Sequence, residues 1–285
     1  MTAPSQVAQP EGAAGAARLL EANGLNLRFG GVQSLADVNL NLDRGEVLAV
    51  IGPNGAGKTS LFNCLTGVYR PQTGTIRYLT KSGSMRDVVG GKPHQITRLG
   101  VARTFQNIRL FAALTALENV KVGVEAAQHT GPVAAMLGAP WARREERESN
   151  DRACELLEFV GLSARTNTVA SSLPYGEQRR LEIARGLGTD PQILLLDEPA
   201  AGTNPSEKRD LELLIANIHR RGVSVLLIEH DMRLVMSAAT RVVVLNFGRV
   251  IAGGTPEQVQ RDPAVIEAYL GSVDEGDGAG DAADR

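Results

Sequence analysis

Cysteine and aromatic residues are scarce in this sequence. Two of its 285 residues are cysteine, Cys64 and Cys154, and aromatic residues make up 4%. These two cysteines lie far apart, in apolar segments with helical character, which argues against a disulfide framework and against a metal site. We therefore predict that both are buried and act as small hydrophobic residues in a reducing compartment.

The sequence also lacks long hydrophobic runs and a strong charge of one sign. Its apolar runs, such as those at residues 193–196 and 242–245, have the length of a strand and are far too short for a helix that crosses a bilayer. The N-terminal residues lack a basic region followed by an apolar stretch, so we expect no signal peptide. The formal net charge of -2 provides no general attraction to nucleic acid. Any contact with a membrane is therefore expected to come through a partner.

The central part of the sequence alternates between strand and helix patterns. Three short segments that are apolar apart from Ser224, at residues 47–51, 193–196 and 223–228, are typical of strands in a parallel sheet with helices on both faces. Two further pairs of segments predict antiparallel strands, namely 25–29 with 38–42 and 242–245 with 249–252. The fold class is therefore α/β, with a mainly parallel sheet and an antiparallel β flank.

Residues 107–190 interrupt this alternation and predict an inserted helical subdomain. Thr115 and Glu118 form a capping-box pattern that opens a helix. A second helix, at 141–159, carries a charged face that we expect to be solvated, with an apolar stripe at Cys154, Leu157 and Val160. The predicted organisation is a disordered leader at 1–18, a first core part at 19–106, the helical subdomain at 107–190, a second core part at 191–271, and a disordered acidic tail at 272–285.

A phosphate-binding loop is the strongest functional signal. The spacing Gly, four residues, Gly, Lys, Ser/Thr is met by Gly52, Pro53, Asn54, Gly55, Ala56, Gly57, Lys58 and Thr59. The loop follows an apolar strand and precedes a helix, as the chemistry requires. Its glycines let successive N–H groups turn toward phosphate oxygens, the Lys58 ammonium can follow the transferring phosphoryl group, and the Thr59 hydroxyl can bind Mg²⁺.

Three other segments carry polar residues of interest. Each lies just after a predicted apolar strand or where the predicted core gives way to the helical subdomain. Asp197 and Glu198 follow an apolar strand, where Asp197 can support Mg²⁺ and Glu198 can act as a general base on the attacking water. His230 follows the next apolar strand and can donate to a γ-phosphate. Gln106 lies where the core meets the helical subdomain and can contact Mg²⁺ or the water. Taken singly, each has an ordinary explanation as a cap or a solvated side chain.

Taken in order, these segments resemble one family, the ATP-binding subunits of ABC transporters. The segment that is specific to this family is residues 173–178, Leu-Pro-Tyr-Gly-Glu-Gln, which lies between Gln106 and Asp197. The resemblance covers residues 22–271 and implies head-to-tail dimers in which each ATP meets the phosphate loop of one subunit and the signature segment of the other. It implies nucleotide contacts from Phe29, Ser60 and the loop, and across the dimer from Tyr175, Gly176 and Glu177.

Two positions depart from the usual family pattern. Pro174 and Tyr175 stand where Ser and Gly are usual, and Pro174 has neither a hydroxyl nor an N–H to offer a phosphate. The contact across the dimer then depends on Gly176 and the start of the helix. Asn204 stands where Asp is common, and it fits as an N-cap before Pro205.

Within the family, the sequence looks most like an ATPase of branched-chain amino-acid importers. The resemblance is carried by residues 103–111, the Tyr175–Gly176 signature, residues 197–202, 228–232 and 254–257, and the close at 269–271. Such importers pair two ATPases, the same or different, with membrane-spanning permease subunits and, indirectly, a substrate-binding protein. The resemblance therefore places the chain at the cytoplasmic face of the plasma membrane, with Phe111 near the permease contact and no nucleic-acid partner.

Four alternatives remain open at this point. The ATPase of a lipopolysaccharide-type exporter has a similar core, but a signature beginning Leu-Ser-Gly-Gly would favour it. A soluble ABC ATPase of DNA repair would carry a long coiled-coil insert, and a translation-associated ABC protein would carry two phosphate loops. A nucleotide-binding module without activity would lack Glu198 and His230. The sequence does not identify the transported substrate, because an ATPase subunit of this kind does not contact the substrate.

Overall fold

The computed structural model describes residues 17–127 and 140–270. The chain forms two compact units. The first unit contains the described residues of 17–79, 85–91 and 226–270, and the second contains those of 80–84 and 92–225. None of the described helices is long and apolar enough to cross a membrane.

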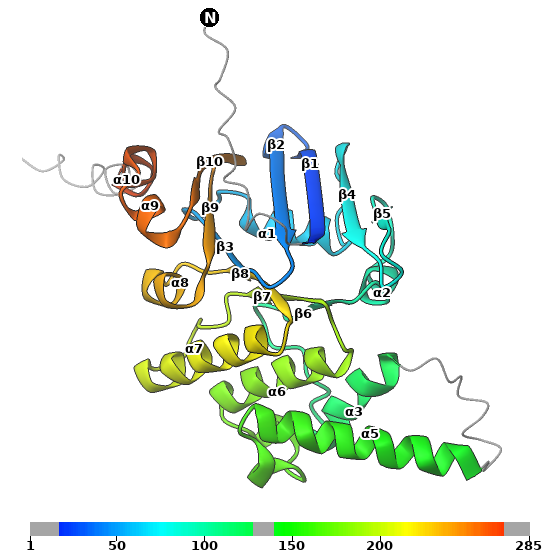
Figure 1. Cartoon of the computed structure of the whole chain (residues 1–285). Coiled ribbons are helices and arrows are strands. Elements are labelled where there is room, and N and C mark those ends of the chain that lie inside the picture. Colours follow the sequence, from blue (N-terminus) through cyan, green and yellow to red (C-terminus); the bar gives the residue numbers. More distant parts are fainter. Residues whose placement is uncertain (1–16, 128–139, 271–285) are drawn as a thin grey trace, which may run out of the picture. The chain divides into compact units, whose positions relative to one another are not determined.

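The first unit contains a four-stranded antiparallel sheet (Figure 1). Its strand order is β2-β1-β4-β5, with bounds β1 (Arg18–Phe29), β2 (Val32–Asp43), β4 (Thr73–Leu79) and β5 (Met85–Asp87). Leu25 lies opposite Val38, so the predicted antiparallel pair is confirmed, although both strands are longer than expected. β1 begins at Arg18, the last residue that the sequence had assigned to the leader, so that assignment was one residue too long. β4 and β5 were not predicted, because β4 lacks a continuous apolar face.

The first unit also contains the strands that carry the phosphate loop. β3 (Val47–Ile51) is parallel to β9 (Arg241–Asn246), and β9 forms a hairpin with β10 (Arg249–Gly254). β8 (Ser224–Ile228), whose second half belongs to this unit, neighbours β3. The helices of the unit are α1 (Lys58–Leu65), α8 (Met232–Ala238), α9 (Pro256–Gln260) and α10 (Pro263–Leu270). All five residues of β3 are buried, which confirms the predicted apolar strand. The antiparallel pairing of β9 with β10 confirms the predicted hairpin.

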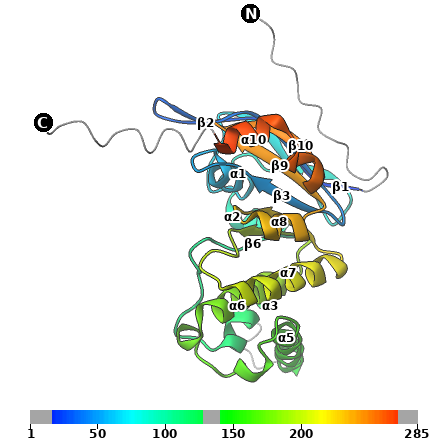
Figure 2. The ribbon, with the colours of Figure 1, turned by 90° about the vertical axis from the view of Figure 1, so that its left-hand side faces the viewer.

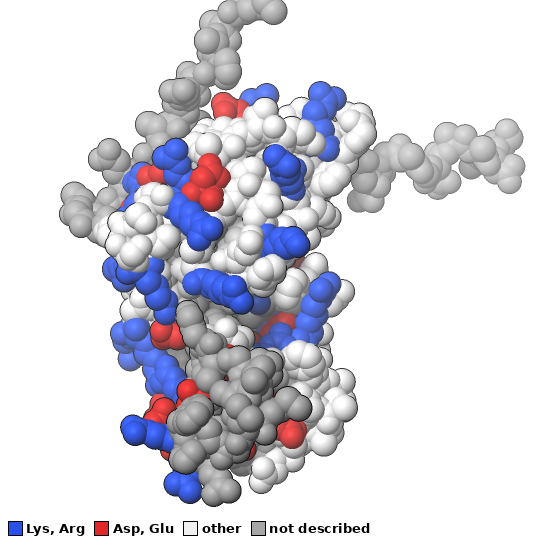
Figure 3. Space-filling view, turned by 90° about the vertical axis from the view of Figure 1, so that its right-hand side faces the viewer, with Lys and Arg blue, Asp and Glu red and all other residues white. Residues whose placement is uncertain are grey.

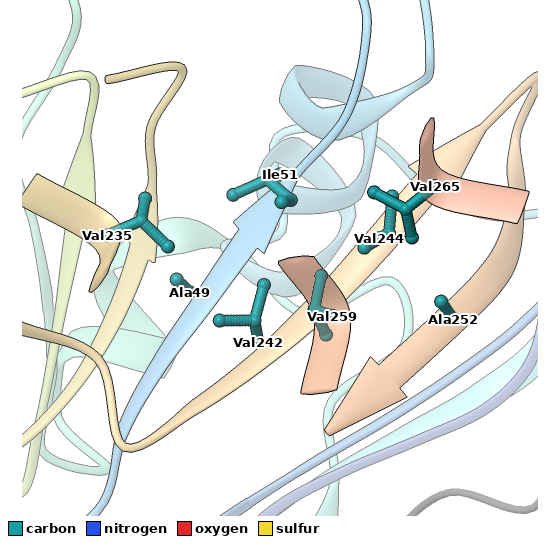
Figure 4. Packing of buried hydrophobic residues seen from close by; sticks show 8 residues of the cluster. All are labelled: Ala49, Ile51, Val235, Val242, Val244, Ala252, Val259 and Val265. Carbon is teal, nitrogen blue, oxygen red and sulfur yellow. The ribbon is translucent and has the colours of Figure 1, made fainter. Parts of the chain in front are cut away.

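A small aliphatic cluster holds the C-terminal helices against this sheet. Figure 4 shows the side chains of β3 and β9 facing Val259 of α9 and Val265 of α10, with Val235 of α8 at one end. The β-branched residues Val242 and Val244 are buried in this cluster. Burial of each such side chain contributes about 1.5–3 kcal/mol, so the short helices are stabilised by tertiary packing.

The second unit is mainly helical. Its strand pair is parallel, with Ala102 of β6 (Val101–Arg103) opposite Leu194 of β7 (Ile193–Asp197). Figure 2 shows α3, α5 and α6 lying together. The helices are α2 (Pro93–Thr97), α3 (Ala116–Ala127), α5 (Pro140–Phe159), α6 (Tyr175–Gly188) and α7 (Pro205–Arg220), with short 3₁₀ turns η1 (Ser163–Arg165) and η2 (Ala170–Ser172). Among the described residues of 107–190 the structure places no strand, apart from an isolated bridge between Thr115 and Val169.

Local capping signals were read correctly from the sequence. The Thr115 hydroxyl accepts from the Glu118 N–H at 3.2 Å, and the Glu118 carboxylate accepts from the Thr115 N–H at 2.7 Å. The Asn204 side chain accepts from the N–H groups of Ser206 and Glu207, with Pro205 as the first residue of α7. Both predicted helix starts are therefore confirmed.

The predicted burial of the cysteines was right for one and wrong for the other. Cys64 is buried, and this burial raises the pKa of its thiol to about 11. Cys154 is exposed, because the inner stripe of α5 runs instead through Ala153, Leu156 and Leu157. A shift of one position along a helix turns a side chain by about 100°, so a phase error of this size moves a residue from the core to the surface.

Helices α3 and α6 approach closely where two glycines meet. A Cβ on Gly123 would lie 2.1 Å from the backbone oxygen of Arg185, and one on Gly188 would lie 2.9 Å from the backbone nitrogen of Val124. The overlaps are with backbone, so no rotamer change relieves them. Only glycine fits this helix crossing.

Gly123→Ala is expected to destabilise the protein by about 1–3 kcal/mol through overpacking, despite the gain in helix propensity. Urea denaturation measures the free energy of unfolding. Gly31→Ala is the matched control, since a Cβ there meets no atom within 4 Å. A Gly123→Ala protein as stable as the wild type would contradict this close packing.

Candidate functional site

The phosphate loop joins β3 to α1 in the first unit. Gly55 and Gly57 have φ angles of 78° and 100°, in the region that favours glycine. A Cβ on Gly52 would lie 2.0 Å from the backbone oxygen of Leu245, and one on Gly57 would lie 2.5 Å from that of Ser34. The loop conformation therefore requires glycine on both conformational and steric grounds.

The lysine of the loop is held over it. The Lys58 ammonium donates to the backbone oxygens of Gly52 at 2.7 Å and Pro53 at 3.0 Å, and Lys58 is 7% exposed. The side chain of Thr59 is exposed at the start of α1, where its hydroxyl can bind a cation. The Ser60 hydroxyl lies 2.7 Å from that of Ser34. The arrangement is a cradle of N–H groups with one fixed positive charge, which suits a polyphosphate.

The remaining loop residues contribute backbone. Asn54 is exposed and Ala56 is buried. The Ala56 N–H donates to the Pro53 oxygen at 3.2 Å, and the Ala56 oxygen accepts from the Gly248 N–H at 3.0 Å. These bonds tie the loop to the turn of the β9–β10 hairpin, which limits its motion.

Two more predicted residues belong to the first unit. The ring of Phe29 is 47% exposed and meets the Tyr69 ring edge-on, at 5.1 Å between centroids. An exposed ring fixed by a second ring is a platform on which a base can stack. His230 follows β8; its backbone N–H donates to the carboxylate of the buried Glu229 at 3.1 Å, and its side chain is 61% exposed.

The second unit brings three polar side chains of the prediction to the end of β7. Gln106 donates from Nε2 to Glu198 Oε2 at 2.9 Å. Glu198 has a φ of 46°, which a residue with a Cβ adopts at a cost of about 1–3 kcal/mol and which recurs at functional sites. Glu198 and Gln106, which the sequence singled out separately, are therefore direct neighbours.

Asp197 has a partner that the sequence did not reveal. Arg103 of β6 donates to Asp197 Oδ2 at 2.8 Å, and both side chains are buried. This ion pair holds the Asp197 carboxylate in place at the end of β7. Because the guanidinium already occupies one oxygen, Asp197 is suited to support a cation through water. β6 has three residues, too few for a periodic pattern to show.

The signature segment forms the start of α6. The helix begins at Tyr175, one residue before the predicted Gly176, and Pro174 in the N-cap position makes no side-chain capping bond. Gly176 is buried, and a Cβ there would lie 2.5 Å from Glu207 Oε1. Glu177 forms an ion pair with Arg165 at 3.0 Å. The exposed face of this helix start is therefore provided by Tyr175, which is 43% exposed.

Sequence reasoning gave no role to a buried pair on the same helix. Arg179 and Glu182 are each 1% exposed and form an ion pair at 3.2 Å. Burial raises the pKa of Glu182, against the opposing effects of the Arg109 N–H and of Arg179. A charged pair within an apolar helix core is the signal that could have drawn attention to them.

Comparisons with known proteins agree with this geometry. Residues 35–201 match the model of the ABC transporter family, and residues 249–275 match that of the branched-chain amino acid ATP-binding cassette transporter. The chain is 49% identical over 256 residues to LivG, the high-affinity branched-chain amino acid transport ATP-binding protein of Escherichia coli, with 90% of this chain and 98% of that protein covered. It is 50% identical over 256 residues to the protein BraF of Pseudomonas aeruginosa, with the same description and coverage.

A solved structure shows the same fold. The ADP conformation of MJ1267, an ATP-binding cassette of an ABC transporter, superposes with a TM-score of 0.76 at 29% identity. The alignment covers 89% of this chain and 99% of that one. The predicted α/β fold with an antiparallel flank and helical part is therefore confirmed.

Proposed function

Since this chain belongs to the ABC transporter family as an ATP-binding subunit, we propose that it powers the import of branched-chain amino acids by hydrolysing ATP. The observation that carries this proposal is the similarity to LivG and BraF along nearly their whole length. The match of residues 249–275 to the branched-chain amino-acid model supports the same substrate class. The buried lysine and required glycines of the phosphate loop support the ATPase activity.

In this proposal the first unit binds the nucleotide. The backbone N–H groups of residues 52–60 receive the phosphates, Lys58 neutralises their charge, and Phe29 stacks on the adenine. The exposed Thr59 hydroxyl fits Mg²⁺, which when bound would neutralise charge on the phosphates. His230, with an exposed ring, donates to the γ-phosphate.

Glu198 provides the catalytic carboxylate in this proposal. Glu198 accepts a proton from the attacking water as general base, and Gln106, in direct contact with it, orients that water and supports the cation. Asp197, fixed by Arg103, would help to hold the cation. The contact between Gln106 and Glu198 supports these shared roles, because a water bound to one of them lies within reach of the other.

The partners follow from the same assignment. A second ATPase subunit, the same or different, binds head to tail, so that the start of α6 with Tyr175, Gly176 and Glu177 faces the partner's nucleotide. Permease subunits hold the pair at the cytoplasmic face of the plasma membrane, and a substrate-binding protein acts through them. On the face drawn in Figure 3, Lys and Arg side chains are spread among uncharged residues and fewer acidic ones.

Phe111 offers a test of the permease contact. Its ring is 49% exposed and lies under the Arg185 guanidinium at 5.7 Å. Phe111→Asp is expected to reduce transport by about tenfold or more while leaving ATP hydrolysis by the isolated chain unchanged, because a charge is placed in an apolar contact. Phe247→Asp, at another exposed aromatic residue, is the control. Transport at the wild-type level in Phe111→Asp would contradict the contact.

Transport itself is tested by reconstitution. The chain, a candidate sister ATPase, the permease subunits and the binding protein are placed in liposomes, and ATP-dependent uptake of leucine, isoleucine and valine is compared with that of glutamate. Uptake of the three apolar amino acids is expected. ATP-dependent movement of lipopolysaccharide with no amino-acid uptake would favour the exporter alternative instead, and hydrolysis that never couples to a permease would favour a soluble ATPase.

A further inference from the structure

One buried guanidinium in the second unit contacts both segments that act on ATP in the proposal above. Arg179 donates from Nη1 to the Phe105 oxygen at 2.6 Å and from Nη2 to the Gln106 oxygen at 2.8 Å. The same Nη2 donates to the Tyr175 hydroxyl at 3.0 Å. Phe105 and Gln106 lie more than 70 positions earlier in the sequence than Arg179. The side chain therefore links the segment that carries Gln106 to the first turn of α6.

Glu182 fixes the same segment through its N–H groups. Its Oε1 accepts from the Phe105 N–H at 3.4 Å and the Arg109 N–H at 3.1 Å, while its Oε2 accepts from Arg179. Arg185 donates to the Arg109 oxygen at 2.5 Å. Side chains of α6 therefore bind both N–H groups and C=O groups in the backbone of residues 105–109. The ring of Phe105 also lies near the guanidinium of Arg109, at 4.4 Å.

This linkage reaches the catalytic carboxylate through one further bond. The backbone oxygen of Gln106 is bound to Arg179, and its side-chain amide is bound to Glu198 at 2.9 Å. Tyr175, the exposed residue of the signature, has its hydroxyl on the same guanidinium. Tyr175 and the Gln106 backbone are therefore bound to one planar guanidinium.

We propose that Arg179 is a positioning residue that makes the start of α6 and the Gln106 segment move together, so that contact at the signature sets the catalytic geometry at Glu198. The inference rests on the proposed ATPase function and adds to it the means by which the signature and the Gln106 segment of one subunit communicate. Tyr175 replaces the usual glycine of the signature here, and its hydroxyl provides the attachment point that a glycine lacks.

The chemistry of the link requires arginine. The guanidinium is a flat fork with several fixed donors, and it reaches three oxygens on two segments and a carboxylate at once. A lysine keeps the positive charge opposite Glu182, but its single ammonium on a flexible chain cannot hold the same set. Arg179→Lys therefore removes the link and retains the buried charge pair.

The test compares Arg179→Lys with Arg180→Lys in the full chain with its sister ATPase. Arg180 is the next residue on α6 and donates to the Val160 oxygen at 3.5 Å. Arg180→Lys therefore controls for the replacement of an arginine by a lysine on the same helix. We expect Arg179→Lys to lower kcat for ATP hydrolysis about tenfold or more, with the ATP Kd and the melting temperature close to those of Arg180→Lys. Loss of ATP binding in step with kcat, or an unchanged kcat, would overturn the proposal.

A double-mutant cycle separates positioning from a general structural effect. If Arg179 acts through Gln106, then Arg179→Lys lowers kcat in the wild-type background and has little further effect in Gln106→Ala. Additive effects would overturn the proposal. A Gln106→Ala protein with wild-type kcat would instead refute the role of Gln106 in the proposed function, which keeps the two failures distinguishable.

Tyr175→Phe is a second variant that leaves the buried charges intact. It removes the hydroxyl that accepts from Arg179 and keeps the ring. We expect kcat to fall several-fold with no change in the ATP Kd, and the loss to vanish in the Arg179→Lys background. A wild-type kcat in Tyr175→Phe would mean that the signature does not act through Arg179, and it would overturn the proposal.

Discussion

Glu198→Gln is expected to lower kcat for ATP hydrolysis by at least about 100-fold, the scale of a general base, while ATP still binds. The amide has the shape of the carboxylate and can keep a hydrogen bond to Gln106, but it cannot take a proton from water. Glutamate and glutamine both carry a Cβ and are of similar size, so the positive φ at residue 198 is expected to cost both proteins about the same, and the stability is expected to change little. Steady-state phosphate release measures kcat, and equilibrium binding of labelled ATP measures the Kd.

Glu125→Gln provides the matched control for this change. Glu125 lies exposed on α3, in the same unit as Glu198. Its substitution also replaces one carboxylate by an amide, at a position distant in sequence from the end of β7. We expect its kcat to equal that of the wild type. Hydrolysis that persists in Glu198→Gln would mean that another group activates the water, and the assignment of the base would be wrong.

Lys58→Ala is expected to weaken ATP binding by about 10- to 100-fold and to abolish hydrolysis. A hydrogen bond from a charged donor contributes about 1.5–3 kcal/mol, and the Lys58 ammonium is the fixed positive charge of the loop, held by the Gly52 and Pro53 oxygens. Isothermal titration with ATP and Mg²⁺ gives the Kd. Circular dichroism establishes that the variant is folded before the affinities are compared.

Lys81→Ala removes an ammonium without touching the loop. Lys81 pairs with Asp190 at 3.3 Å, but the two side chains are 62% and 76% exposed, and pairs this exposed contribute little. The control is therefore expected to bind ATP as the wild type does. Equal affinities for Lys58→Ala and the wild type would refute the role of the loop lysine in phosphate binding.

The parts of the fold that depend on neighbouring residues were predicted from the sequence. β3 and the phosphate loop follow from an apolar run and a fixed spacing of glycines, since both the strand and the turn are decided by consecutive residues. The helix starts at Thr115 and Asn204 follow from side chains that cap backbone groups two or three positions away. Lys58, Asp197 and Glu198 were proposed as functional residues from local patterns of the same kind.

The tertiary structure decided which of these residues meet and what holds them. Arg103 and Asp197 are 94 positions apart, Gln106 and Glu198 are 92 apart, and Arg179 and Phe105 are 74 apart. A composition or periodicity pattern spans about one helix, so it carries no information on such pairs. The close crossing at Gly123 and the surface position of Cys154 were decided in the same way, because helix phase is set by the partner against which a helix packs. Sequence patterns therefore determined the chemistry that the chain carries, and long-range packing determined which side chains act together.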